Sequence, residues 1–464
     1  MNYKKIKMPP IVAYSLKGKF LVFILRLLYS CISLFWGINW QKPLKNFEES
    51  PAFFAWKDIL YLGYKYYFRP PFVFPSATIQ YFKNQNVEIN SPSDFKEKTR
   101  LTISAGGDLM PYEWIQKQYT QNLWDEVGDF FFSADIVFAN LETPIYLKKS
   151  ASLVPEVMLS DMLFNANAEM FEIFSGNGQY KGYDILSTAN NHSLDMGEEG
   201  VIATIEFLEQ QKIAFVGTAR SPEERQNPPI IEKNGIKIAF LAYTFSLNQF
   251  LLEENKKYLA NMIRLNIENP DLEEIKRDVL NVKHRDADLV VLSLHIGNAY
   301  QAFPSEHIIS TFHRVFEECG VDIILGSHPH NPQPMEIYEF SCPFKQEKKK
   351  GFAIYSLADF VAYDIFVWDR LVPLLKLHIS KGELNGKPHT QLSEIEVLPV
   401  FNCGIFKSHT KKEMRFLDLE KLINSMEKHK FPSFLEKKHR KEAQYLYQFA
   451  QKIGLKKRIL GEKA

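Results

Sequence analysis

The sequence predicts an α/β fold of the layered sandwich type between about Leu101 and Val400. Short apolar segments follow one another along this stretch, and segments with helical periodicity separate several of them. The sequence contains no internal repeat of fixed period. Strands of four to seven residues that alternate with helices indicate a substantially parallel sheet covered by helices. The strand-like segments are LTISAG, ADIVFA, YDILSTA, KIAFVG, IKIAFLAYTF, ADLVVLSLH, VDIILG and GFAIYSL, and the helical patterns include GVIATIEFLEQQ and HIISTFHRVFEECG.

Length and composition bound the class of protein. A chain of 464 residues is long enough for two or three structural units. Its formal charge of +1 gives no indication of wholesale nucleic-acid binding. The four cysteines are scattered and form no C-x-x-C pair, so neither a disulfide framework nor a zinc ribbon is predicted. A reducing cytoplasm and a cysteine-poor bacterial surface both fit this usage.

Residues 1–82 form an apolar and aromatic N-terminal unit. The run Phe20–Ile38 is near the length needed to cross a bilayer, and no small-x-small cleavage site follows it. Arg26 near its middle argues against a comfortable span. A membrane anchor, an interfacial amphipathic segment and a buried helix therefore all remain open. The aromatic stretch Phe53–Phe74 fits either a membrane–water interface or a helix packed on the main domain.

Two further segments flank the predicted domain of residues 101–400. Residues 83–100 are polar, contain Ser-Pro-Ser and are predicted to be a linker. Residues 401–464 are predicted to be a tail that is helical and locally basic from about Lys407. A solvated helical face explains that charge, and attraction to anionic lipid or an acidic polymer is the alternative.

Polar side chains recur where the predicted strands end. In an open α/β sheet, ligands bind at the carboxyl ends of the strands. Five segments would therefore deliver Asp, Glu, Asn and His side chains to one edge of the sheet. The two histidines of the last segment are two residues apart, and on an extended backbone they would point the same way. The residues are Asp108, then Asn140 and Glu142, then Asn190, Asn191 and His192, then His295, and finally His328 and His330.

This mixture of side chains suits a divalent metal centre. Carboxylates favour hard ions and imidazoles favour Zn, Mn or Fe, so one or two such ions are expected, their identity open. His192 directly follows Asn191 and is placed to protonate a leaving group. Asp195, on the same loop, would fix its ring by a hydrogen bond. Nearby cations would lower the pKa of His192 unless a carboxylate supports the charged form.

Six motifs, in this order, resemble the CapA-type capsule (poly-γ-glutamate) synthesis family over about Leu101–Val400: GGDLM, NLETP, STANNHSLDMGEEG, SLHIG, GSHPHNPQPMEIY and YSLADF. That family resembles calcineurin-like metallophosphatases in fold. The resemblance implies that His192 is the catalytic histidine of an Asn-His pair. It also implies a membrane-associated protein of the bacterial cell envelope, with a cytoplasmic location as the alternative, and other capsule synthesis proteins as partners. The implied metal shell is Asp108, Glu142, Asn191, His295, His328 and His330.

The motifs also depart from the family pattern. Asp108-Leu109-Met110 lacks the histidine of the phosphatase D-x-H motif, which weakens one of two metal positions. The usual H-W-G-x-E-Y is His295-Ile-Gly-Asn-Ala-Tyr300, the usual G-H-H-P-H has Ser327 at its second position, and the usual S-L-G-N-F is SLADF, ending at Phe360. The metal positions are kept while their surroundings differ.

Three functions follow from these observations. The first is a metal-dependent hydrolase of a phosphoester or related bond, linked to capsule or surface polymer synthesis. The second is an accessory protein that uses metal and the basic tail to bind an anionic polymer without turnover. The third is a degenerate domain kept as a scaffold. Metal content separates the third from the others, and turnover of a phosphodiester separates the first from the second.

Overall fold

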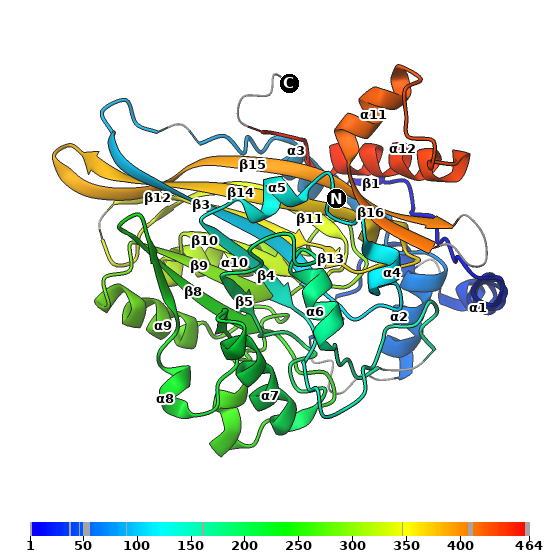
Figure 1. The fold of residues 1–464 in the computed structure, drawn as a ribbon, viewed down its shortest axis with the longest axis horizontal. Coiled ribbons are helices and arrows are strands. Elements are labelled where there is room, and N and C mark those ends of the chain that lie inside the picture. The colour runs from blue at the N-terminus through cyan, green and yellow to red at the C-terminus, as the bar shows by residue number, and fades with distance from the viewer. Residues whose placement is uncertain are drawn as a thin grey trace.

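The computed structural model describes residues 2–36, 39–45, 47–49, 56–89, 91–159, 162–345, 347–406 and 412–459. Two β-sheets lie face to face at its centre, with helices on their outer faces (Figure 1). The eight-stranded sheet has the order β16-β15-β14-β3-β4-β5-β6, with β13 paired to β3, and the six-stranded sheet has the order β11-β12-β10-β9-β8-β7. The rings of Phe138 and Phe240 stack between the two sheets, 6.0 Å apart. The predicted layered α/β sandwich is therefore confirmed.

The strands are as follows. The first sheet contains β3 (Lys96–Leu109), β4 (Ile136–Leu141), β5 (Ile185–Ser187), β6 (Ala214–Val216), β13 (Asp359–Val361), β14 (Leu371–Leu384), β15 (Lys387–Phe406) and β16 (Lys412–Asp418). The second contains β7 (Ile230–Lys233), β8 (Ile236–Thr244), β9 (Leu289–His295), β10 (Ile323–Ser327), β11 (Pro332–Ser341) and β12 (Lys348–Leu357). A separate pair joins β1 (Tyr3–Lys5) to β2 (Val73–Pro75).

The helices are α1 (Leu16–Trp36), α2 (Trp56–Tyr67), α3 (Ser76–Lys83), α4 (Lys117–Thr120), α5 (Gly128–Phe132), α6 (Ala168–Phe174), α7 (Gly197–Gln210), α8 (Pro222–Arg225), α9 (Glu273–His284), α10 (Glu306–Cys319), α11 (Leu419–Glu427) and α12 (Lys437–Lys452). Short 3-10 turns lie at Asn39–Gln41, Glu254–Leu259 and Val367–Arg370, the last called η4.

Every predicted apolar segment is a strand, and the two predicted helical patterns are α7 and α10. The reason is burial: every residue of β4, β5, β9 and β10 is buried. Strands covered on both faces appear in the sequence as continuous apolar runs. Strands β3 to β6 are parallel and consecutive, and β8, β9, β10 and β12 are parallel in the second sheet. Each sheet therefore has one edge where the carboxyl ends of its parallel strands meet.

The predicted linker and tail boundaries differ from the structure. Residues 96–100 belong to β3, where Arg100 pairs with Ser380 of β14; this end of the strand projects into solvent, which explains its polar composition. β15 continues past residue 400 to Phe406, and β16 then pairs with it. Met414 and Phe416 alternate with more exposed residues, a period of two that indicates a strand. Within the described residues of the tail, the predicted helical part is α11 and α12.

The apolar N-terminal run forms one helix, α1, whose last predicted residues, 37 and 38, lie outside the described residues. One stripe of α1, including Val22 and Tyr29, joins the core and packs on α2. A Cβ at Gly63 would lie 1.8 Å from the Tyr29 hydroxyl, so only glycine allows this approach of the two helices. The opposite stripe is exposed, so α1 is neither free of the domain nor buried in it.

The aromatic stretch that follows packs on the main domain. Tyr61, Tyr64 and Tyr66 of α2 are buried, and the Tyr66 hydroxyl donates to Asp364 Oδ1 at 2.7 Å. Lys65 is fully buried and donates to the carbonyl of Ala299 at 2.8 Å. The described part of this stretch is therefore a helix packed on the main domain, one of the two interpretations that the sequence left open. Residues 53–55 lie outside the described residues.

Candidate metal centre

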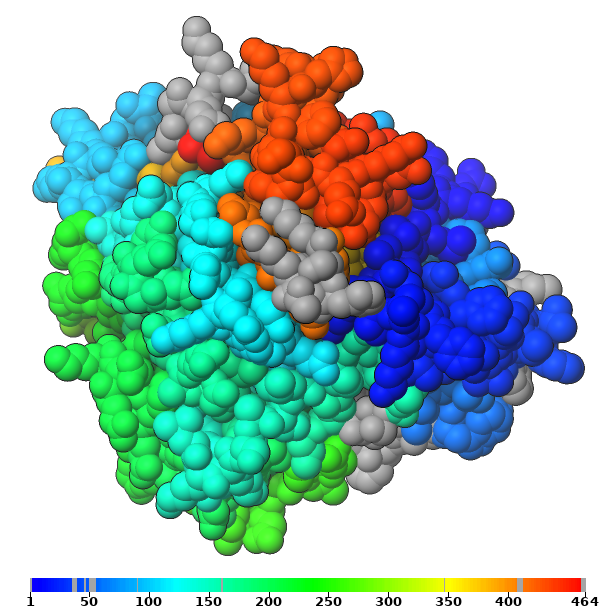
Figure 2. All heavy atoms as spheres, turned by 45° about the vertical axis from the view of Figure 1, so that its right-hand side comes forward, coloured from blue at the N-terminus to red at the C-terminus, as the bar shows by residue number. Residues whose placement is uncertain are grey.

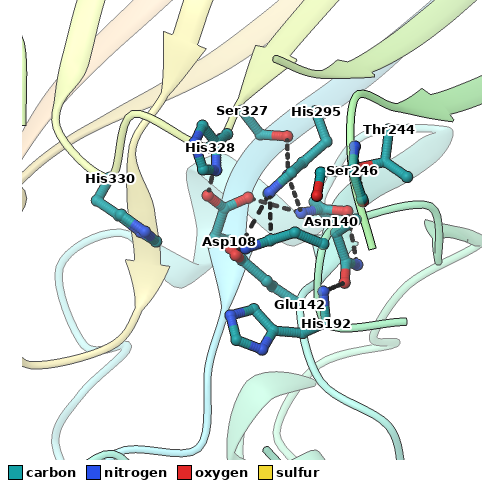
Figure 3. Close-up of polar contacts among 12 residues, drawn as sticks. Asp108, Asn140, Glu142, His192, Thr244, Ser246, His295, Ser327, His328 and His330 are labelled. Carbon is teal, nitrogen blue, oxygen red and sulfur yellow. Dashed lines mark hydrogen bonds and ion pairs between the residues drawn. The ribbon is translucent and has the colours of Figure 1, made fainter. Parts of the chain in front are cut away.

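The predicted site residues lie at the carboxyl ends of strands from both sheets (Figure 3). The expectation of one sheet edge was too simple, because the eight-stranded sheet carries Asp108, Glu142 and Asn191 and the six-stranded sheet carries the three histidines. Asp108 pairs with Asn140 in the β3–β4 register, and His295 pairs with Ser327 in the β9–β10 register. The two edges face each other, so the six side chains gather in one place.

The centre of this site is formed by Asp108, Glu142 and His295. Their ligand atoms all lie within 4.8 Å of one another, and each residue is 0% exposed. His295 Nε2 lies 3.4 Å from Glu142 Oε1 and 2.8 Å from Asn191 Oδ1. Two carboxylates, an imidazole and an amide oxygen therefore lie close together and are shielded from solvent.

Two residues that the sequence analysis did not place in the shell hold these ligands in position. Ser327 Oγ lies 2.9 Å from His295 Nδ1, so the serine that departs from the family motif orients the imidazole. Asn140 Nδ2 donates to Asp108 Oδ1 at 2.7 Å. Outer hydrogen bonds of this kind fix the direction in which a ligating group points.

A second group adjoins the first and contains a residue that the sequence analysis noted only as a departure from the family. Asp108, His330 and Asp359 have ligand atoms within 4.8 Å of one another, and His330 Nδ1 lies 2.9 Å from Asp359 Oδ1. Asp359 opens β13, which pairs with β3 so that Asp359 is opposite Asp108. The position left weak by the missing D-x-H histidine therefore has a carboxylate from another strand beside it.

The loop with His328 and His330 is not extended, contrary to the expectation. Its two histidines have φ values of +95° and +63°, and Ala358 beside them has +61°. Such left-handed conformations cost on the order of 1–3 kcal/mol each outside glycine and cluster at functional sites. The two rings are 5.9 Å apart at their centroids, and the His328 backbone N–H faces Asp108 Oδ2 at 3.4 Å.

Glu48, from the N-terminal segment, reaches this loop. Its Oε1 lies 3.6 Å from His328 Nε2 and its Oε2 lies 3.8 Å from Lys65 Nζ. The Ala299 N–H donates to Oε2 at 3.0 Å. Burial opposes the charge of Glu48, but Lys65 and then His328 outweigh burial and hold its pKa at about 2. Nothing in the sequence signals this contact, because Glu48 stands 280 residues before His328 in a segment of membrane-like composition.

His192 lies beside this cluster and is supported by Asp195. Its Nδ1 is 2.6 Å from Asp195 Oδ2, and its ring stacks on Phe164 with 3.7 Å between centroids. The Phe164 N–H also donates to Asp195 Oδ2, at 2.6 Å. Burial lowers the pKa of His192, but Asp195 and Glu142 more than offset burial, so the pKa lies above its ordinary value. The carboxylate support expected from the sequence is present.

The electrostatics of the site fit a divalent cation. Burial, and then Glu142, raise the pKa of Asp108 to about 7, while burial lowers the pKa of His295 to about 3 and that of His328 to about 4. The neutral imidazoles of His295 and His328 have the form that binds metal. His330 differs, because burial is outweighed by Asp359, which holds its pKa well above the ordinary value, so an ion bound by His330 would have to displace that proton. Both carboxylate oxygens of Glu142 and both ring nitrogens of His328 are buried without a hydrogen-bond partner among the described residues. Buried polar atoms without partners are costly, and a bound ion would satisfy them.

Known proteins share this sequence pattern. The family model of the bacterial capsule synthesis protein PGA_cap matches residues 102–364. The capsule biosynthesis protein CapA of Bacillus anthracis is 26% identical over 285 residues, which cover 60% of this chain and 63% of that protein. The PGA biosynthesis protein CapA of Bacillus subtilis (strain 168) is 24% identical over 330 residues, 70% of this chain and 79% of that protein.

Among solved structures, the calcineurin-like phosphoesterase YfkN from Bacillus subtilis overlaps 75% of this chain and 99% of that chain, with 13% identity and a TM-score of 0.36. So weak an overlap adds nothing to the fold described above. The family match spans more than half of the 464 residues and contains every strand end that carries a site residue. The chain belongs to the bacterial capsule synthesis protein family PGA_cap.

Proposed function

We propose that this protein is a metal-dependent hydrolase of a phosphoester or related bond and acts in the synthesis of a capsule or poly-γ-glutamate-like surface polymer. The observation that carries the proposal is the buried group Asp108, Glu142 and His295. The Glu142 carboxylate has no hydrogen-bond donor among the residues that the structure describes, and His192 beside it is supported by its own carboxylate, Asp195. Such a pairing provides a place for metal and a separate proton donor. A metallophosphatase-like mechanism follows from it.

The ligands would be shared between two positions. Asp108, Glu142, Asn191 and His295 would hold one ion, and Asp108, His330 and Asp359 would hold another, with His328 beside both. Oxygen and imidazole donors suit Mn, Zn or Fe. Bound there, a divalent ion would polarise a phosphoryl oxygen and lower the pKa of a coordinated water.

The chain's own contribution is to move a proton. Asp195 holds Nδ1 of His192, which leaves Nε2 as the nitrogen that can donate to a leaving group. Phe164 covers one face of the ring and keeps it from rotating away. His192 is 9% exposed, so its ring stays largely shielded from water while it lies beside Glu142 (Figure 3).

A second function is favoured by the covering of the His295 loop. Asn298 Nδ2 donates to the carbonyl of Phe47 at 2.8 Å, so the N-terminal segment lies over the loop where the family has other residues. A closed centre of this kind suits an accessory protein that holds metal and binds an anionic polymer, together with other capsule synthesis proteins, without turnover.

We also propose that the protein associates with the membrane of the cell envelope through α1; the alternative location is the cytoplasm. Among the described residues, Leu16–Phe35 is long and apolar enough to cross a bilayer, with a mean hydropathy of 1.7. Since the other stripe of α1 packs on α2, the exposed stripe fits a helix lying in the interface better than one that spans it. Figure 2 shows the N-terminal residues, in dark blue, gathered on one side of the molecule. The exposed stripe contains Leu16, Phe20, Phe23, Ile24, Leu27, Leu28, Leu34 and Phe35.

The test is metal analysis of the purified chain, followed by a screen of phosphoesters and γ-glutamyl peptides with that metal added. His192→Ala should keep the metal and lose turnover by roughly 10²- to 10⁴-fold, the usual range for general acid catalysis. Asp195→Asn should lose less, because it removes only the support of the ring. Unchanged turnover in His192→Ala would remove that residue from the mechanism, and no turnover in a metal-loaded parent chain would favour the polymer-binding role.

A further inference from the structure

A buried group of three carboxylates lies behind the metal centre, outside the ligands that the sequence predicts. Asp359, Asp364 and Asp369, called here the acidic trio, have oxygens that all lie within 4.8 Å of one another. None of the three is more than 3% exposed. They come from β13, from the loop after it and from η4, so a single short stretch of chain folds back to bring them together.

The three members differ in how well they are hydrogen-bonded. Asp364 has the most partners, because Oδ1 accepts from Tyr66 and from the Phe366 N–H and Oδ2 accepts one hydrogen bond, from the Tyr112 hydroxyl. Oδ1 of Asp359 contacts His330, and its Oδ2 is buried with no hydrogen-bond partner in the described part of the chain. Neither carboxylate oxygen of Asp369 has a hydrogen-bond partner among the described residues, although the residue is only 2% exposed. A buried carboxylate without a hydrogen-bond partner among the described residues therefore lies close to the oxygens of two other carboxylates.

The cations nearby balance only part of this charge. Arg370, the next residue, directs Nη1 to Glu442 at 3.2 Å and Nε to the backbone carbonyl of Asp364 at 2.6 Å. His330 is bound to Asp359 and faces the metal centre. Burying a carboxylate without a partner costs several kcal/mol, so the trio needs either a proton or a cation.

We propose that the acidic trio binds a hard divalent cation, such as Mg²⁺ or Mn²⁺, at a position distinct from the metal centre. All of its donors are carboxylate oxygens, the set that these ions prefer, with no imidazole to favour zinc. Asp359 belongs both to the trio and to the group with Asp108 and His330, so an ion in the trio fixes the strand that supplies the second metal position. The trio is then a structural cation site, and its ion holds Asp359 of β13 in position beside the metal centre.

The experiment is anomalous diffraction from crystals of the full parent chain grown with Mn²⁺, together with metal counting on two variants. We expect an anomalous peak between the Asp369 and Asp359 carboxylates. Asp369→Asn should lose one Mn²⁺ per chain and keep the ion held by His295, whereas His295→Ala should lose the ion at the centre and keep the one at the trio.

The outcomes separate this inference from the proposed function. A filled centre with no density at the trio, or the same Mn²⁺ count in Asp369→Asn as in the parent, would mean that the trio is held by a shared proton and would overturn the inference. If His295→Ala binds as many Mn²⁺ ions as the parent while Asp369→Asn binds fewer, the cation site at the trio is supported and the proposed metal centre is contradicted. The diffraction arm needs no variant to fold.

Discussion

At the scale of single residues, Glu48 joins the N-terminal segment to the loop that contains His328. Its partner Lys65 has a side chain that is 1% exposed, and burial lowers the pKa of Lys65 to about 8 even with Glu48 present. Removing one member of a buried pair leaves an uncompensated charge, which costs about 3 kcal/mol. Glu48→Gln should therefore lower the free energy of unfolding by about that amount in urea titrations.

The matched control is Glu49→Gln, which neutralises the neighbouring half-buried carboxylate and should have little effect. Glu48→Gln combined with Lys65→Met should recover much of the loss, because no buried charge remains. A stability of Glu48→Gln equal to that of Glu49→Gln would show that the contact with Lys65 contributes nothing.

Glu48 also illustrates which parts of the site could not be predicted from the sequence. Asp108, Glu142 and His295 could be predicted because polar residues at the carboxyl ends of parallel strands mark a site, although these strands belong to two facing sheets and not to one. Glu48 and Asp359 could not, since one comes from a segment whose composition suggested a membrane and the other from a strand of three residues that pairs with β3 through space. A long-range contact leaves no local pattern of hydrophobicity.

At the scale of elements, the buried carboxylate of Asp322 joins three of them at the start of β10. The Val290 N–H of β9 donates to its Oδ2 at 2.8 Å, and its partners Lys349 and Lys283 come from β12 and α9. Burial raises the pKa of Asp322, but the two lysines outweigh burial, so the net pKa lies below its ordinary value. A carboxyl with a depressed pKa in the folded state stabilises the protein above its unfolded pKa of about 3.9.

Asp322→Asn should thus be less stable than the parent at pH 7 by about 2 kcal/mol, the usual contribution of a hydrogen bond to a charged group. The difference should shrink as the pH falls below about 4 and vanish once the folded carboxyl is protonated as well. Denaturant titrations of both chains between pH 7 and pH 3 measure this. A difference that does not change with pH would mean that packing, and not charge, supplies the stability.

The α1 helix is the element whose role the fold leaves most open to experiment. Phe23 and Leu27 are 58% and 52% exposed on its outer stripe. Burial of such a side chain contributes about 2 kcal/mol, so Phe23→Gln with Leu27→Gln should weaken binding to anionic vesicles roughly 100-fold or more. Sedimentation with the vesicles measures this, and the melting temperature should hardly change.

Leu251→Gln, at a leucine that is 66% exposed in a loop far from α1 in sequence, is the control and should bind vesicles like the parent. Substitution is a sharper test than deletion of residues 1–80, because deletion also removes Glu48, Lys65 and the packed face of α2. Vesicle binding that survives the double substitution would contradict the membrane role of the stripe.

At the scale of the whole molecule, the alternating strands and helices were predictable because a sheet buried on both faces requires continuous apolar runs. The antiparallel hairpin β14–β15 and its neighbour β16 were not, since long-range pairing forms them and β16 lies in a basic segment whose composition also fits a helix. The N-terminal segment was separated from the domain on composition, although it completes the same core. Two facing sheets, not one, therefore assemble the site.

The arrangement of charge in that core predicts that bound cations stabilise the fold. Five buried carboxylates, those of Asp108, Glu142, Asp359, Asp364 and Asp369, gather where the sheets meet, and without cations they repel one another. An ion that binds only the folded chain stabilises it by about 2.7 kcal/mol at a hundred times its dissociation constant. The melting temperature should therefore fall by a few degrees in a chelator and recover when Mn²⁺ is added back. Asp108→Asn with Asp369→Asn, measured in parallel, should melt at nearly the same temperature with and without the chelator, because the double variant has lost both the repulsion and the ions. A parent chain whose melting temperature ignores both chelator and Mn²⁺ would show that protons, and not metals, neutralise this cluster, and would remove the physical basis of the metal centre.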